Sequence, residues 1–206
     1  MKNIVKLTFT LLAISLIVSC TGDREIAPFK PVFFSQNFDG IENTGPGQYI
    51  TLDGWSNVSI NGGKKWEART FGGEIFAQQS AFGSGESNMD SWLISPAIDF
   101  TQTSNETLVF DYLSGYNNGQ AVSVLVSTDY DGSNTAAAIN AATWTNLNVT
   151  LPDFLASGYP ANFSHSAAID LSGFNGNGYI AFRYTGSTTG TTSTYEIDNI
   201  KLYENK

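Results

Sequence analysis

The sequence is short of cysteine, histidine and basic residues. Its 206 residues include one cysteine and one histidine, and its ten lysines and arginines are outnumbered by nineteen acidic residues, for a formal net charge of −9. One cysteine cannot close a disulfide within the chain, so the fold must be held by packing. An acidic surface repels phosphate backbones and anionic headgroups, which argues against a nucleic-acid partner. Zinc-ligand spacings, phosphate-binding loops and dinucleotide fingerprints are also missing from the sequence.

The longest apolar run lies near the N-terminus and has the layout of a secretory signal. Lys2 and Lys6 frame the start of a mostly apolar stretch at 7–18, which is shorter than the roughly 20 residues of a membrane-spanning helix. The four residues before the single cysteine, Leu-Ile-Val-Ser, resemble the lipobox of bacterial lipoproteins. The resemblance implies that a signal peptide, residues 1–19, is removed and that Cys20 carries the lipid. An ordinary signal peptide with a chance cysteine is the alternative.

The residues after Cys20 predict where the protein goes and how it is attached. Thr21 is not acidic, so the inner-membrane retention rule known from other bacteria does not apply. We therefore expect a lipid anchor in the cell outer membrane, with the protein facing either the periplasm or the outside. Residues 20–31 are polar and contain two prolines, which predicts a short tether. The remaining residues, 32–206, suit one domain better than two small ones.

The rest of the sequence has the pattern of a β-protein. Aromatic, β-branched and threonine-rich runs alternate with clusters of Gly, Asn, Asp and Ser. Apolar residues such as Leu108, Phe110 and Tyr112 recur at every second position, which predicts strands with one buried face. Only 135–142 suggests a helix. Because no β-α-β alternation appears, we expect an all-β, antiparallel, two-sheet jelly-roll sandwich. The predicted strands are 32–38, 48–53, 64–70, 74–80, 92–98, 106–114, 121–128, 145–151, 166–171, 178–186 and 194–204.

Six motifs follow one another along the chain, among them FDG at 38–40, SWLISPAIDF at 91–100, LVFDY at 108–112, IAFRY at 180–184 and YEIDNI at 195–200. Their order and spacing resemble the cleaved-adhesin, or choice-of-anchor J, domain found on Bacteroidetes surface proteins. The resemblance spans nearly all of the chain after the tether. It implies a jelly roll related to MAM and carbohydrate-binding modules, a surface-binding or adhesive role, and structural calcium in some members.

Two aspartates form a candidate calcium site. If the strand 194–204 is regular, Asp198 shares a face with Ile200 and Leu202 and points into the core, where a carboxylate needs a partner. Calcium accepts six to eight oxygen ligands and suits an extracellular, loop-rich domain. The resemblance places Asp39 opposite the last strand, so we hypothesise that Asp39 and Asp198 share one structural Ca²⁺. The alternatives are that Asp198 accepts hydrogen bonds from a turn, or that a bulge turns it outward.

Two further acidic segments are weaker candidates for cation binding. Residues 129–134 (DYDGSN) resemble the start of an EF-hand, but the twelfth position holds Asn140 and helices do not flank it, so a hairpin loop is favoured. Asp90, close to Glu86, lies in an acidic loop that either binds a cation or is solvated, and solvation is favoured.

Aromatic residues supply the candidate ligand-binding positions. Trp92 and Trp144 occupy strand positions and are assigned to the core, where large aromatic side chains dominate. Trp55 and Trp66 are weaker core candidates. Aromatic rings in jelly-roll modules can stack on the apolar face of a sugar. The candidate ligand-binding residues are Trp55, Trp66, Tyr116 and Tyr159.

The sequence favours binding over catalysis. The one histidine, His165, has no cysteine partner, and a nucleophile elbow is missing. We therefore expect a non-catalytic surface lipoprotein that binds glycan or a surface protein. A glycan-degrading hydrolase or lyase is one alternative, and it predicts a cleft with two carboxylates about 5–9 Å apart. A structural subunit of a surface assembly is the other, and it predicts an exposed apolar patch.

Overall fold

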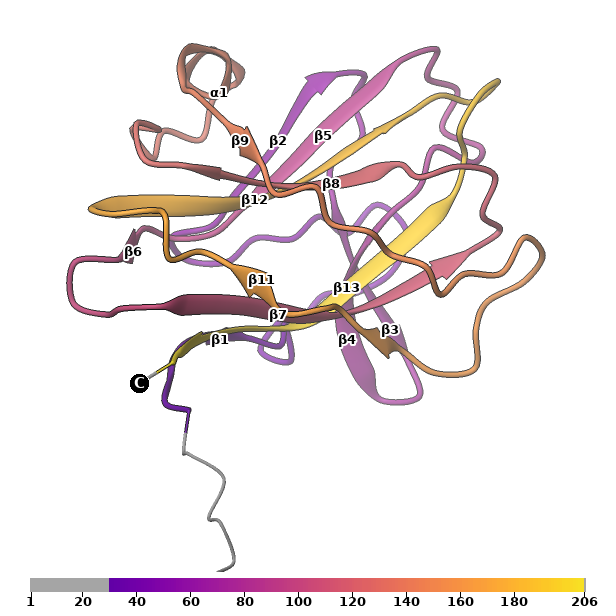
Figure 1. Ribbon diagram of the computed structural model, residues 1–206. Helices are drawn as coiled ribbons and strands as arrows, with labels where there is room; N and C mark the ends of the chain where they lie inside the picture. The colour runs from indigo at the N-terminus through magenta and orange to yellow at the C-terminus, as the bar shows by residue number, and fades with distance from the viewer. Residues whose placement is uncertain (1–29, 206) are drawn as a thin grey trace, which may run out of the picture.

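The computed structural model describes residues 30–205 and shows two antiparallel sheets packed face to face (Figure 1). The first sheet has the strand order β10-β7-β13-β4-β3, with β1 also paired to β13 and β11 to β7. The second sheet has the order β2-β5-β12-β8-β9, with β6 also paired to β12. The expected all-β jelly-roll sandwich is confirmed.

Strands of very different length build the two sheets. The first sheet consists of β1 (Val32–Gln36), β3 (Glu67–Phe71), β4 (Glu74–Gln79), β7 (Glu106–Gly115), β10 (Ser164–His165), β11 (Ile169–Asp170) and β13 (Thr194–Glu204). The second consists of β2 (Ser56–Asn61), β5 (Met89–Ile94), β6 (Ile98–Asp99), β8 (Val122–Ser127), β9 (Thr145–Asn146) and β12 (Asn177–Gly186). The suspected helix is present as α1 (Ala136–Ala141), and Thr135 caps it by accepting a hydrogen bond from the Ala138 amide.

Alternate residues of the long strands fill the space between the sheets. On β7, Leu108, Phe110 and Tyr112 are at most 1% exposed. Phe110 meets Phe182 of β12 edge to face, with ring centroids 5.1 Å apart. Each such side chain stabilises the fold by roughly 1.5–3 kcal/mol on burial. This packing provides the stability that disulfides supply in many exported domains.

A second apolar cluster lies on the outer face of the second sheet, beneath α1 (Figure 1). Trp144 packs against Trp92 and Tyr130 with ring centroids 5.0 and 5.4 Å away. The Trp144 indole also donates a hydrogen bond to the Ile139 carbonyl of α1. Trp92 and Trp144 are therefore structural, as expected, although they hold a helix onto the sheet and do not lie between the sheets.

One predicted strand is wrong, and two real strands, β2 and the two-residue β10, were missed. Residues 48–53 make only an isolated bridge, Tyr49 to Glu67, and a turn follows at 53–54. The missed strand β2 has the polar sequence SNVSIN, which does not show an apolar alternation. Its Asn57 is 6% exposed, and its side-chain amide donates to the Ile50 and Trp66 carbonyls. Hydrogen bonding to the backbone explains how so polar a strand is buried.

A β-bulge changes the direction of the side chains along β13. The pairing with β7 shifts register between Asp198 and Lys201, and Asn199 has a φ of 48°. The residues that face the core are Tyr195 and Ile197 before the bulge and Ile200 and Leu202 after it. Asp198 therefore points to the outer face of the sheet. The expectation that it shares the core face with Ile200 and Leu202 is wrong.

The attachment region stays a prediction. The signal peptide 1–19, Cys20 and most of the tether lie outside the described residues. No helix within residues 30–205 is long and apolar enough to cross a membrane. The chain enters the sandwich at β1, which pairs with the C-terminal half of β13 (Figure 1).

Candidate functional site

A depression crosses the outer face of the first sheet, over β3, β4 and β13. Because Ala68, Ala77 and Tyr195 face the core, the residues next to them on each strand face outward. Those outward residues include Arg69 and Gln78, which line the depression. The site is therefore a direct product of strand alternation.

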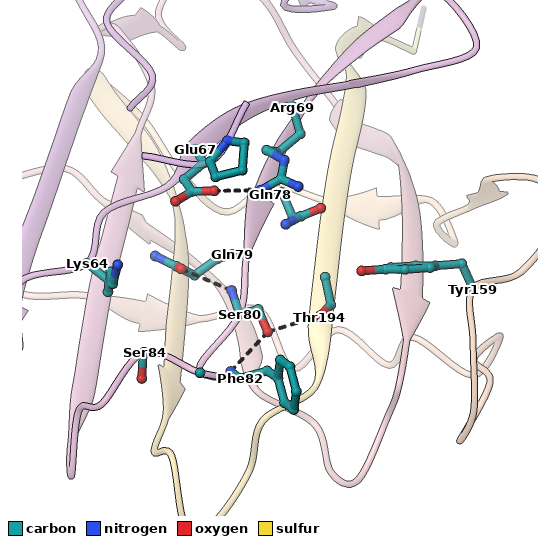
Figure 2. A pocket seen from close by; sticks show the side chains of 12 residues that line it. Lys64, Glu67, Arg69, Gln78, Gln79, Ser80, Phe82, Ser84, Tyr159 and Thr194 are labelled. Carbon is teal, nitrogen blue, oxygen red and sulfur yellow. Dashed lines mark hydrogen bonds and ion pairs between the residues drawn. The ribbon is translucent and has the colours of Figure 1, made fainter. Parts of the chain in front are cut away.

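Two adjoining hollows make up this depression. One has a volume of about 240 Å³ and the other about 400 Å³, within or near the usual size of ligand pockets. Both are lined by Arg69, Gln78 and Tyr159, so they form one continuous groove. Figure 2 shows the smaller hollow, with the Tyr159 ring on one side of the Thr194 strand and Lys64 on the other. We call the two hollows together the sheet groove.

Exposed aromatic rings border the sheet groove. Phe71 and Phe82 line it and are 82% and 81% exposed, and Tyr159 lines both hollows. Tyr116 packs edge to face on Tyr159, with ring centroids 5.2 Å apart. Tyr116 and Tyr159, two of the predicted ligand-binding residues, are thus brought together from separate loops and remain about half exposed.

A long loop between β9 and β10 holds Tyr159 in place. Its backbone bonds to the end of β7: the Tyr116 amide donates to the Gly158 carbonyl and the Asn117 amide to the Leu155 carbonyl. The Tyr159 ring lies against Gly115, where an added Cβ would meet the ring at 2.4 Å. Gly115 therefore provides the space that the tyrosine ring occupies.

The floor of the sheet groove carries hydrogen-bonding and charged side chains. Arg69 and Glu67 form an ion pair at 2.9 Å. Glu196 of β13 is 7% exposed, and burial raises the pKa of its carboxyl to about 7, against a lowering by the nearby Arg69 charge. The Gln79 side-chain nitrogen is buried and has no hydrogen-bond partner within residues 30–205. Aromatic borders around a polar floor suit a ligand with both apolar faces and hydroxyl groups.

The structure corrects two of the predicted ligand-binding residues. Trp66 is fully buried and Trp55 is 9% exposed, and both belong to the core between the sheets. Trp55 packs on Phe38, and the Trp66 indole donates a long hydrogen bond to the Ser91 carbonyl. Neither ring can contact a ligand, because both are buried between the sheets. Large aromatic rings are favoured there because they bury much apolar area.

The candidate calcium residues lie near each other, away from the core. Asp198 is 4% exposed and a bulge turns it outward, as one of the alternatives has it, while its hydrogen bonds come from the Asn199 amide and side chain within the strand and not from a turn. Burial above all, with the charges of Asp39, Asp111 and Glu74, raises the pKa of Asp198 to about 7, against a lowering by the Asn199 amide. Asp39 itself is exposed. Within residues 30–205, no three acidic, histidine or cysteine side chains are grouped to hold a metal together.

The other acidic segments are structural. Asp90 is 7% exposed and receives two hydrogen bonds from the Arg183 guanidinium, at 2.9 and 2.8 Å. The expectation that its loop binds a cation or is solvated is wrong, because an arginine from β12 neutralises it. Asp129 accepts hydrogen bonds from the Ser127 hydroxyl and the Thr143 amide, and Asp131 accepts one from the Ser133 amide, which lowers the pKa of both and fits the expected hairpin loop. His165 is exposed and bonds to Asp111.

Sequence reasoning missed most of the groove floor. The regular strand predicted for 194–204, with Asp198 facing the core, puts Glu196 on the core face as well, whereas the structure has Tyr195 and Ile197 in the core and Glu196 outside. Arg69 and Gln78 lie in predicted strands, next to the apolar residues Ala68 and Ala77. No local pattern shows that β3, β4 and β13 lie side by side, so only the tertiary structure brings these residues together.

Residues 82–205 match a family model described as "Domain of unknown function (DUF5017)". The chain belongs to this family. The matched span includes Tyr159 and Glu196, whereas Arg69 and Gln78 precede it. A search of the curated proteins finds no match to the sequence.

Solved structures share the fold at low identity. The K2 cleaved adhesin domain of Lys-gingipain superposes with a TM-score of 0.56 and 16% identity, over 84% of this chain and 99% of that one. The K3 domain of the same protein, from Porphyromonas gingivalis, gives a TM-score of 0.50 and 16% identity, over 84% and 100%. The resemblance to cleaved-adhesin domains is thus confirmed for the fold. Membership of the choice-of-anchor J family stays a prediction.

Proposed function

We propose that this protein is a non-catalytic, lipid-anchored outer-membrane protein that binds an extended glycan in the sheet groove. The observation that carries the proposal is the pairing of exposed rings, Tyr159 and Tyr116, with a floor of hydrogen-bonding side chains. The apolar face of a pyranose stacks on an aromatic ring, while its hydroxyl groups bond to polar side chains. The adhesin domains that share the fold support a binding role.

The position of the groove on β13 supports an arrangement in which the groove faces away from the membrane. Val32, where the chain enters the sandwich, pairs with Tyr203, whereas Thr194 and Glu196 line the groove near the other end of the same strand. At about 3.3 Å per residue, the groove lies roughly 25 Å from the entry point. A short tether at Cys20 therefore leaves the groove directed away from the attachment side.

A structural calcium ion near Asp198 is part of the proposal. A buried carboxylate among three other carboxylates needs a positive partner, and Ca²⁺ with backbone carbonyls fits that need. Asp39 and Asp198 would hold the ion, which would stabilise the bulge of β13. The ion is proposed as structural and has no role in chemistry.

The test of glycan binding compares two exposed aromatic residues of one loop. Tyr159→Ala removes a ring of the groove, while Phe154→Ala removes a ring that is 53% exposed and lines neither hollow. On a glycan array followed by calorimetry, we expect Tyr159→Ala to weaken binding about ten-fold and Phe154→Ala to leave it unchanged.

Three results would count against this function. Equal affinities of the two variants would remove the groove from the binding site. A protein captured in place of any glycan would favour the assembly role. Shortened oligosaccharides in the reaction mixture would favour the hydrolase or lyase alternative, since the groove does contain carboxylates.

A further inference from the structure

Glu196 is the one buried carboxylate on the floor of the larger hollow. It comes from β13, lines the hollow beside Leu113 and Gln78, and is 7% exposed. Within residues 30–205, its carboxylate accepts no hydrogen bond and forms no ion pair. A buried carboxylate without donors is costly, and such groups are normally paired.

The nearest positive charge does not neutralise this carboxylate. The Arg69 guanidinium attracts it but is hydrogen-bonded to Glu67 at 2.9 Å. No group of the described residues therefore donates a hydrogen bond to Glu196, although Arg69 lies next to it on the same floor. Water, or a ligand that displaces it from the hollow, therefore supplies the donors that Glu196 lacks.

Amide groups without hydrogen-bond partners lie in both hollows of the sheet groove. The Gln78 side chain lines the larger hollow with Glu196 and makes no hydrogen bond within the described residues. The Gln79 side-chain nitrogen, buried and without a partner among these residues, lines the smaller hollow. The groove thus presents one charged acceptor together with amide groups that both donate and accept. Sugar hydroxyl groups, which also donate and accept, match this set.

The charges along the groove disfavour anionic ligands. Three carboxylates, Glu67, Glu74 and Glu196, line it against two cations, Lys64 and Arg69. The whole chain carries a net charge of −9. An acidic sugar would bring its charge next to Glu196, where the low dielectric strengthens repulsion.

Resting on the proposed function, we infer that Glu196 determines specificity: it accepts hydrogen bonds from hydroxyl groups of an uncharged glycan and rejects uronate and sulfated glycans. A charged acceptor makes hydrogen bonds about twice as strong as neutral ones, so one well-placed hydroxyl pair carries much of the selectivity. Glu196 is held in the free protein at a cost in stability, as is common for binding residues.

The test uses an isosteric substitution and a matched control. Glu196→Gln removes the charge and keeps the shape, and Glu42→Gln makes the same change at an exposed position that lines neither hollow. Binding is measured by calorimetry at pH 8, above the Glu196 pKa of about 7 so that its carboxylate is charged, against a neutral β-glucan, a xylan, a mannan, polygalacturonate, a sulfated glycan and chitosan. Thermal melting of each variant without glycan is measured in parallel.

We expect the wild type to bind a neutral polysaccharide and not the anionic ones. Glu196→Gln should bind that polysaccharide at least about ten-fold more weakly, yet melt at a higher temperature, because an unpaired charge is gone. Glu42→Gln should match the wild type in both. A residue with a purely structural role does not raise the melting temperature and weaken binding in one substitution.

The outcomes separate this inference from the proposed function. If a glycan binds, and Tyr159→Ala weakens its binding but Glu196→Gln does not, then binding in the sheet groove is supported and the role of Glu196 is refuted. Preference for polygalacturonate, a sulfated glycan or chitosan also refutes the inference and leaves glycan binding intact. Absence of any glycan binding by the wild type overturns both.

Discussion

Asp198 has a fully enclosed carboxylate whose neighbours are mostly acidic. Burial is the largest cause of its raised pKa, of about 7, and the charges of Asp39, Asp111 and Glu74 add to it. Because this pKa lies above the ordinary value of 3.8, the folded state holds the proton more tightly than the unfolded state. The stability contribution of the group is therefore largest below about pH 4 and is lost as pH rises through 7.

This loss of stability with rising pH gives a prediction that also tests the proposed calcium ion. In chelator, the protein should melt at a lower temperature at pH 8 than at pH 5, because Asp198 and Glu196, whose pKa values are both raised to about 7, lose their protons over this range. The part due to Asp198 corresponds to a free energy on the order of 3 kcal/mol. Calcium at pH 8 should restore stability, because the ion neutralises the carboxylate. Asp198→Asn should reduce both effects. Identical melting temperatures in calcium and in chelator at pH 8 would contradict the proposal that Asp198 binds a calcium ion.

At the scale of elements, the loop between β9 and β10 decides the shape of the groove wall. It has little secondary structure, yet three backbone hydrogen bonds join it to the end of β7 and to the residues just after it. Its Tyr159 ring occupies the space left by Gly115, at the last position of β7. The strand thus positions the loop, and the loop positions the Tyr159 ring at the border of the sheet groove.

Adding one methyl group at Gly115 tests this arrangement. The Cβ of Gly115→Ala would meet the Tyr159 ring at 2.4 Å and the Gly158 carbonyl at 2.9 Å, so the loop must shift. We expect glycan affinity to fall about as far as in Tyr159→Ala, while the melting temperature falls by only a few degrees. Gly173→Ala is the control, since nothing lies within 4 Å of its added Cβ. Unchanged affinity in Gly115→Ala would show that the loop position does not matter.

At the scale of the whole molecule, the entry of the chain and the sheet groove lie at opposite ends of β13. The chain enters where β1 pairs with the C-terminal half of β13 (Figure 1), whereas Thr194 and Glu196 at the N-terminal end line the groove. Because roughly 25 Å separates the two ends, we expect the proposed anchoring and binding to be independent.

Removing the proposed lipid attachment tests that independence. Cys20→Ser should abolish incorporation of labelled palmitate and release the protein from the membrane fraction. The released protein should bind glycan with an affinity within about two-fold of the wild type. Persistent labelling, or retention in the membrane fraction, would contradict lipidation at Cys20.

Many of the strands could be predicted from the local pattern of apolar residues. Alternating apolar residues such as Leu108, Phe110 and Tyr112 mark a strand with one buried face, and the structure buries all three. Strand β2 could not be predicted, because its burial depends on Asn57 bonding to the backbone of residues 50 and 66. Hydrogen bonds between segments have no signature within either segment.

For the candidate site, the sequence by itself determined residue types and the presence of a strand: exposed loop tyrosines at 116 and 159, and an acidic residue at 196 within the predicted strand 194–204. The tertiary structure alone decided that these residues meet, that Trp55 and Trp66 are core, and that a bulge turns Asp198 outward. The physical reason is that alternation is local, within one strand, whereas strand order, bulges and competition for core volume are set by the packing of the whole sandwich.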